Sequence, residues 1–187
     1  MSEGGTLVGI ARARGSIGTG ARARVTAAPI DEPAVRAALA EVMDPEIPVL
    51  SVVDLGIVEA VEITPDSIRV TILPTFVGCP ALELIRTAIA DRLGAFGRPV
   101  AVDVSFAVPW TSDRISATGR RALHDSGFAP PSPAGTGSGP IVLGPPVECP
   151  HCGSRRTVLE NVFGPTQCRS IHHCTACRQP FEQFKAI

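Results

Sequence analysis

The sequence predicts an α/β fold of the α+β kind, a small open α-β-β-α-β-α sandwich followed by a C-terminal module that four cysteines hold together. Three observations lead to this prediction. Helical and strand-like hydrophobic periodicities alternate in the first part of the chain. A stretch rich in Pro, Gly and Ser then interrupts all periodicity, and two CxxC pairs follow it. Helices and strands in this order bury their apolar faces against one another in layers.

The first helix has a clear start and a clear stop. Asp31 is a good N-cap residue, Pro33 suits the first turn, and Pro45 ends the helix. Apolar residues at helical spacing predict the face that packs on the core: Val35, Leu39, Val42 and Met43.

Two strands come next, over residues 57–63 and 68–73, around a turn at residues 64–67. The second strand alternates apolar and polar residues, so one of its faces should pack against a helix layer. The apolar residues of that face are Ile68, Val70 and Ile72.

The remaining elements of the sandwich continue the pattern. A second helix is expected over residues 81–93, and its buried face should hold Leu82, Ile85 and Ile89. A third strand is indicated by alternation at Val100, Val102, Val104 and Phe106. Ser112 or Asp113 can cap a last helix that runs to about Ser126.

Composition divides the chain into four segments. Residues 1–28 are rich in Gly, Ala and Arg and should form a disordered extension. Residues 29–131 form the α/β domain, residues 132–146 a Pro/Gly linker, and residues 147–187 the cysteine module. The extension lacks the continuous apolar stretch of a Sec signal, and no apolar run approaches the roughly 20 residues of a membrane span. A cytoplasmic protein without membrane contact is therefore expected.

Charge and cysteine content narrow the function classes. Residues 29–146 hold 14 Asp and Glu against 8 Arg, whereas residues 147–187 hold 5 Lys and Arg against 3 Glu. Neither segment has the dense basic face of a nucleic-acid-binding protein, so no nucleic-acid partner is expected. In a reducing compartment, six cysteines favour metal or thiolate chemistry over disulfides.

The two CxxC pairs predict a metal site. Cys149 and Cys152 form the first pair, Cys174 and Cys177 form the second, and 21 residues separate the pairs. Four soft thiolates at the corners of a tetrahedron suit Zn²⁺ or iron, and a closed site of this kind usually holds up a small fold. We therefore expect a structural zinc ribbon. Two metal-free redox pairs and a rubredoxin-like iron site for electron transfer are the alternatives, and a nucleic-acid-binding ribbon is a third.

Cys168 lies between the pairs and has three interpretations: a buried small residue, an alternative metal ligand, or a thiolate for metal exchange. His172 and His173 flank the second pair and are expected on a hairpin strand rather than on the metal.

A further cysteine lies where a strand ends and a helix begins. Pro80 suits the first helical position, which would make Cys79 the N-cap residue. Unpaired N–H groups and the helix dipole would then favour the thiolate, and Thr75 could donate a hydroxyl hydrogen bond to the sulfur. The alternative is that Cys79 is inert packing.

Asp44 and Glu46 follow the first helix in a loop stiffened by prolines. Two carboxylates in such a loop could bind a metal ion or the basic residues of a partner. The alternative is turn chemistry, in which Asp44 caps nearby N–H groups. Gly56, in the next segment, most simply supplies a turn.

Several of these motifs resemble known families. Asp44-Pro45-Glu46, Asp54-Leu55-Gly56 and Gly78-Cys79-Pro80 resemble a small α/β family implicated in iron–sulfur protein assembly. Together with Pro109-Trp110-Thr111-Ser112-Asp113 and the cysteine module, which includes Phe163-Gly164 and Pro180-Phe181, they are similar to the PaaD family over about residues 31–187. Its members are D subunits of bacterial phenylacetyl-CoA epoxidase systems.

This resemblance implies an accessory role in aerobic phenylacetate degradation, without catalysis by the chain itself. It implies maturation of the oxygenase and reductase subunits by insertion of iron or an iron–sulfur cluster, with the 2Fe–2S reductase as the main partner. It assigns the reactive role to Cys79, with Asp44 and Glu46 nearby, and Zn²⁺ binding to the four CxxC cysteines. One cysteine cannot hold a cluster alone, so Cys168, a partner chain, a homodimer or a small thiol must supply further ligands.

Overall fold

The computed structural model describes Met1, residues 30–132 and residues 146–186. Apart from Met1, the predicted extension over residues 1–28 lies outside the described residues, as does nearly all of the predicted linker over residues 132–146. None of the helices in the described ranges is both long and apolar enough to cross a membrane.

The first helix, α1, spans Glu32–Leu39 and begins as predicted. The Asp31 carboxylate accepts a hydrogen bond from the Ala34 N–H at 2.9 Å. The helix ends at Leu39, before Pro45, and Met43 forms an isolated β-bridge with Ser51. The prediction that Met43 belongs to the buried stripe is therefore wrong, and its side chain is 42% exposed.

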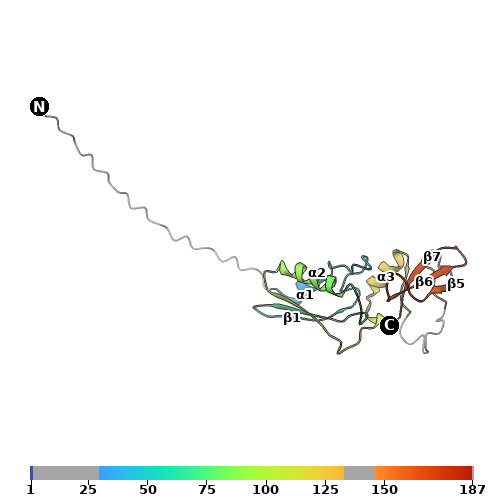
Figure 1. Ribbon diagram of the computed structural model, residues 1–187, viewed down its shortest axis with the longest axis horizontal. Coiled ribbons are helices and arrows are strands. Elements are labelled where there is room, and N and C mark those ends of the chain that lie inside the picture. The colour runs from blue at the N-terminus through green and yellow to red at the C-terminus, as the bar shows by residue number, and fades with distance from the viewer. Residues whose placement is uncertain (2–29, 133–145, 187) are drawn as a thin grey trace.

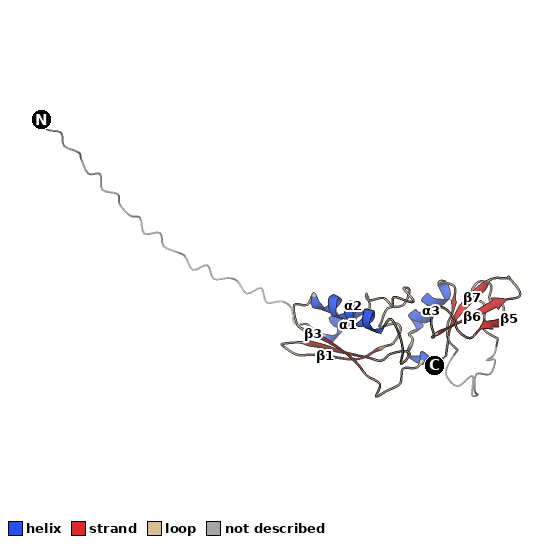
Figure 2. Cartoon of the chain, in the orientation of Figure 1, coloured by secondary structure: helices blue, strands red, loops and turns tan. Residues whose placement is uncertain are grey.

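A three-stranded sheet forms the floor of the α/β part. Its strands are β1 (Val58–Ile63), β2 (Ile68–Ile72) and β3 (Val100–Val104), in the order β1-β2-β3. The central strand β2 pairs antiparallel with β1 and parallel with β3. Its predicted core residues Ile68, Val70 and Ile72 are fully buried, whereas Arg69 is exposed and pairs with Asp103. Figure 2 shows α1 and α2 together over one face of this sheet.

Helix α2 spans Leu82–Gly94 and provides the parallel connection between β2 and β3. Ile85, Ile89 and Leu93 are its buried residues, and Leu82 is only partly covered. The expected alternation of β3 does not reach Phe106, because the strand ends at Val104 and the Phe106 side chain is 60% exposed. The prediction that the third strand includes Phe106 is therefore wrong.

The last helix of this part is shorter than predicted. Ser112–Arg114 form a 3₁₀ turn, η1, and the helix α3 spans Ala117–Asp125. Its N-cap is Ser116, whose hydroxyl oxygen accepts the Gly119 N–H at 2.9 Å, so the predicted caps Ser112 and Asp113 are wrong. A 3₁₀ turn intervenes, and the α-helix begins only after Ser116, whose backbone has the extended conformation of an N-cap.

A second sheet contains the cysteine module. Its strands are β4 (Phe128–Ala129), β5 (Thr157–Asn161), β6 (Arg169–Cys174) and β7 (Pro180–Phe184), in the order β4-β7-β6-β5. Strand β4 directly follows α3 and pairs parallel with β7. The sheet of the module therefore includes a strand from the segment predicted as the α/β domain. Figure 1 shows α3 beside β6 and β7.

The two parts also share a hydrophobic core. Phe184 and Cys168 are buried in the same cluster as the residues of α1, α2 and β2. The Trp110 ring lies 5.8 Å from the Phe184 ring, and its Nε1–H donates to the Leu55 carbonyl at 3.0 Å. Trp110 is thus a core residue that joins the two parts.

Candidate functional site

The four CxxC cysteines form a compact group. Their sulfur atoms all lie within 4.8 Å of one another, with 3.7 Å between Cys149 and Cys177 and 3.6 Å between Cys152 and Cys174. A tetrahedron with metal–sulfur bonds of about 2.3 Å has edges of about 3.8 Å. The donor set and its spacing therefore fit a Zn²⁺ ion held by four thiolates.

Each CxxC pair forms a tight turn. Gly153 N–H donates to the Cys149 carbonyl at 2.9 Å, and Arg178 N–H donates to the Cys174 carbonyl at 2.8 Å. Gly153 and Arg178 both have positive φ, which closes each turn. Hydrogen bonds from the backbone of Cys177 and then Ala176 help lower the pKa of Cys174 to about 6. The backbone thus stabilises the thiolate of Cys174, one of the four potential metal ligands, whereas burial raises the pKa of Cys149.

The histidines of the module lie where the sequence predicts. His172 and His173 belong to β6, and neither is part of the four-thiol group. His172 stacks on Phe181 with ring centroids 5.4 Å apart and shares a 3.1 Å hydrogen bond with Ser170. Phe181 packs with the buried cysteines Cys149 and Cys174, so His172 supports the second core and not the metal itself.

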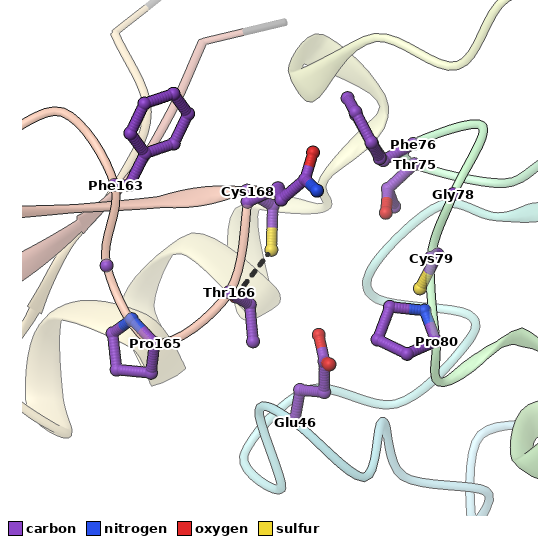
Figure 3. Close-up of a pocket in the computed structure, with 12 residues that line it drawn as sticks. Glu46, Thr75, Phe76, Gly78, Cys79, Pro80, Phe163, Pro165, Thr166 and Cys168 are labelled. Atoms are coloured by element: carbon purple, nitrogen blue, oxygen red, sulfur yellow. Dashed lines mark hydrogen bonds between the residues drawn. The ribbon is translucent and has the colours of Figure 1, made fainter.

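A second constellation lines a cavity of about 320 Å³ between the α/β part and the cysteine module. We call this cavity the thiol cleft. Its lining comes from the loop after α1, the loop before α2 and the loop before β6 (Figure 3): Glu46, Thr75, Phe76, Gly78, Cys79, Pro80, Phe163, Gly164, Pro165, Thr166, Gln167 and Cys168. The structure thus brings Cys79, Thr75, Glu46 and Cys168 together, although they are distant in sequence.

Cys79 is partly exposed to the thiol cleft. It is not the N-cap of α2, because the helix begins at Leu82 and its N-cap is Ala81. Burial raises the pKa of the Cys79 thiol, a hydrogen bond from the Ala81 backbone lowers it, and the charge of Glu46 raises it further. The Ala81 N–H at the start of α2 thus favours the thiolate, as the sequence suggested, but desolvation outweighs it and the net shift is upward.

Thr75 lines the same cavity, in the loop that follows β2. Within the described part of the chain, no hydrogen bond joins its hydroxyl to the Cys79 sulfur. The backbone of the loop is fixed instead by the Cys79 N–H, which donates to the Phe76 carbonyl at 3.1 Å. The predicted bond from Thr75 is therefore not formed in this structure.

Asp44 has the turn role that the sequence left as the alternative. Its buried carboxylate accepts the N–H groups of Glu46 and Ile47, both at 2.8 Å. This turn directs Glu46 into the thiol cleft (Figure 3). Burial and the neighbouring charge of Asp44 raise the pKa of Glu46, while Arg169 lowers it. Among the described residues, the Glu46 carboxylate has these electrostatic neighbours but no hydrogen-bond or ion-pair partner.

Cys168 is buried, with 8% of its surface exposed, and also lines the thiol cleft. Its sulfur shares a 3.1 Å hydrogen bond with the Thr166 hydroxyl, and its carbonyl accepts the Lys185 N–H at 2.9 Å. Burial raises the pKa of this thiol too, and the hydrogen bond from Thr166 lowers it. Cys168 is therefore both a core residue and a cavity residue.

Arg169 and the preceding loop are parts of the site that the sequence did not indicate. The Arg169 guanidinium bonds the Thr166 hydroxyl at 2.9 Å and the Glu182 carboxylate at 2.9 Å. Gly164 N–H donates to the Arg169 carbonyl at 2.8 Å, and a Cβ at Gly164 would lie only 3.0 Å from Arg169 Cβ. The Phe163-Gly164 pair was the only sequence signal for this compact loop.

Known protein families match both parts of the chain. The family model described as "PaaD zinc beta ribbon domain" matches residues 142–185, and the model described as "Iron-sulfur cluster assembly protein" matches residues 32–106. A protein of Escherichia coli (strain K12), named as the putative D subunit of 1,2-phenylacetyl-CoA epoxidase, is 38% identical over 163 residues, which cover 87% of this chain and 97% of that protein.

Some solved structures match about half of the chain. A domain of unknown function from Bacillus anthracis is 28% identical and covers 49% of this chain and 90% of its own, with a TM-score of 0.46. A conserved hypothetical protein from Thermotoga maritima is also 28% identical and covers 50% of this chain and 94% of its own, with a TM-score of 0.45. A protein from Mycobacterium tuberculosis, described as associated with Fe-S complex assembly and repair, is 27% identical over 50% of this chain and 83% of its own, with a TM-score of 0.32.

Proposed function

Because the chain belongs to the PaaD family, the D subunits of phenylacetyl-CoA epoxidase, we propose that it matures this enzyme by delivering iron or an iron–sulfur cluster. The observation that carries the proposal is the thiol cleft. Cys79 reaches solvent there next to a carboxylate that has no hydrogen-bond partner among the described residues. The match to the iron–sulfur cluster assembly model spans residues 32–106 and so includes both side chains.

The two cysteine sites would serve different purposes. The four thiolates of the ribbon saturate one ion, and a saturated zinc site holds a fold together without exchanging ligands. Zn²⁺ bound there would contribute free energy of folding and so stabilise the small second hydrophobic core that contains Phe181. The thiol cleft offers an incomplete ligand set, which suits transient cargo that must leave for another protein.

The chain would act with the other epoxidase subunits, in the cytoplasm, and would not catalyse the ring epoxidation itself. Its partners in this proposal are the oxygenase subunit and especially the reductase subunit with its 2Fe–2S cluster. The name of the Escherichia coli relative, which describes one subunit of an epoxidase, supports such an assembly. A homodimer is a further part of the proposal, in which two clefts would share the ligands of one cluster.

Activation of the epoxidase tests this function. The oxygenase and the cluster-free reductase are incubated with iron, sulfide and the zinc-loaded chain, and epoxide formation is measured. Cys79→Ser should lower the rate of activation at least tenfold, whereas the control Thr118→Ala, on the exposed face of α3, should leave it unchanged. Equal activation by Cys79→Ser and the unaltered chain would show that the thiol cleft does not deliver the cargo.

A further inference from the structure

Three potential ligands converge on the thiol cleft from both parts of the chain. Cys79 comes from the loop before α2, Glu46 from the loop after α1, and Cys168 from the loop before β6 of the cysteine module. Figure 3 shows the two sulfur atoms and the Glu46 carboxylate directed toward the same space. A pair of thiols facing a carboxylate across one cavity is a donor set for a thiophilic divalent ion.

We propose that Cys79, Cys168 and Glu46 together bind one ferrous ion, so that the cysteine module supplies a ligand to the cargo as well as its own zinc site. The evidence for the binding site is the cavity and the residues that line it. Only the purpose of the bound ion rests on the proposed function. The proposal gives Cys168, whose role the sequence left open, a direct function as a metal ligand.

The ligands must move closer together to bind one ion. In the described ranges, the ribbon cysteines are the only group of three or more Cys, His, Asp or Glu ligand atoms that lie within 4.8 Å of one another. Cys168 is held by its bond to Thr166 and by the surrounding core. Glu46 has no hydrogen bond to break, and Cys79 lies in a loop, so these two side chains can turn toward the fixed sulfur.

Charge around the cleft suits the bound form. Binding replaces two S–H protons by Fe–S bonds: Fe²⁺, two thiols and one carboxylate give a complex of charge −1 and two released protons, without any change of oxidation state. Lys185, and Arg169, which also pairs with Glu182, interact electrostatically with Cys168 and can offset part of this negative charge, against the opposing charge of Asp44. Their guanidinium and ammonium groups are held in place over the rings of Phe128 and Phe163, respectively.

The site would stay open on one side. Three protein ligands leave at least one position of a tetrahedral ion free, as in metal sites that accept an outside ligand. Phe76 and Phe163, which are 41% and 64% exposed, line the thiol cleft as well. An incoming thiolate of the recipient protein could therefore reach the ion beside apolar side chains, and ligand exchange would transfer it.

Cobalt(II), a spectroscopic substitute for ferrous iron, tests the site. The chain is prepared with zinc in the ribbon, titrated with Co²⁺ without oxygen, and followed by thiolate-to-cobalt charge-transfer absorption, with zinc retention measured in parallel. The unaltered chain should bind one Co²⁺ beyond its zinc. Cys168→Ser should weaken binding at least tenfold and roughly halve the charge-transfer absorption, because one of two thiolates is lost.

Carboxylate variants keep the test decisive if Cys168→Ser folds poorly. Glu46→Gln should also weaken Co²⁺ binding at least tenfold, whereas Glu62→Gln, on the exposed edge of β1, should not change it. Unchanged binding and absorption in a zinc-retaining Cys168→Ser, or unchanged affinity in Glu46→Gln, would overturn the three-ligand site. If instead the variants lose Co²⁺ but still activate the epoxidase normally, the site stands and the maturation function fails.

Discussion

The Trp110 ring packs 5.8 Å from the Phe184 ring and thereby joins the α/β part to the last strand of the cysteine module. Phe184 is 1% exposed, although it lies only a few residues from the C-terminal end of the chain. The cysteine module is therefore not a structurally separate unit joined to the α/β part by a linker alone. It completes the core of the first part and builds one wall of the thiol cleft.

Phe184→Ala should therefore destabilise both parts at once. Removing a buried phenylalanine side chain typically lowers the free energy of unfolding by about 3–5 kcal/mol. Denaturant unfolding, followed by circular dichroism and by Trp110 fluorescence, should show one shifted transition for both signals. Phe106→Ala is the control, because that ring is 60% exposed and its loss should cost less than about 1 kcal/mol. Two separate transitions in Phe184→Ala would contradict the shared core.

Gly56→Ala should be far more costly than Gly97→Ala. Both glycines have positive φ, 72° and 71°, so both substitutions carry a backbone strain of about 1–2 kcal/mol. At Gly56 a Cβ would also lie 2.2 Å from the Arg114 carbonyl oxygen, whereas at Gly97 nothing lies within 4 Å. The difference in unfolding free energy between the two variants, expected to exceed about 1 kcal/mol, isolates this steric contact. Equal costs would mean that Arg114 moves aside freely.

The ribbon should hold one zinc ion per chain after purification without added metal. Elemental analysis measures the metal, and a colourless protein is expected, because zinc has no visible absorption. Cys149→Ser removes a fully buried ligand and should lose the zinc and lower the melting temperature. Iron at this site, with visible absorption, would instead support the rubredoxin-like alternative, in which the chain transfers electrons.

Alkylation of Cys79 should be slow at neutral pH. Its rate should rise only at a higher pH than the alkylation rate of an ordinary cysteine does. Only the thiolate reacts, and burial together with Glu46 raises the pKa of this thiol, so its thiolate fraction at a given pH is reduced. Mass spectrometry of the Cys79 peptide after timed iodoacetamide treatment gives the pH profile.

Glu46→Gln tests the direction of that electrostatic effect. The variant removes a negative charge that raises the Cys79 pKa, so its alkylation profile should move to lower pH. Glu62→Gln, which is exposed on β1, should leave the profile where it is. A profile that moves to higher pH in Glu46→Gln would refute the electrostatic coupling between the two side chains.

Features encoded by neighbouring residues could be predicted from the sequence. The Asp31 cap, the buried face of β2 and the four ribbon cysteines all depend on short spacings, and the structure has them where predicted. Ser116 and Ala81 cap their helices instead of the predicted residues, because a 3₁₀ turn and a proline turn precede those helices. Such turns are decided by tertiary packing, and helix boundaries shift with them.

The candidate site was only partly predictable for a different reason. Cys79 and Glu46 carry local signals, but nothing in the spacing between Cys79 and Cys168 shows that they share a cavity. Their proximity depends on how β4 and Phe184 dock the module against the α/β part. The pKa of Cys79 likewise follows from desolvation by that packing, and this effect outweighs the helix-end effect that the sequence suggested.

The direct test of the account is transfer of labelled iron. The zinc-loaded chain is charged with ⁵⁵Fe²⁺, freed of unbound metal and mixed with cluster-free reductase subunit, and the radioactivity on the separated reductase is counted. We predict that the unaltered chain passes most of its label to the reductase, while Cys79→Ser and Cys168→Ser retain and pass less than about a tenth as much, in line with the loss of a metal ligand. Equal transfer by Cys79→Ser would contradict the central claim that the thiol cleft carries the cargo.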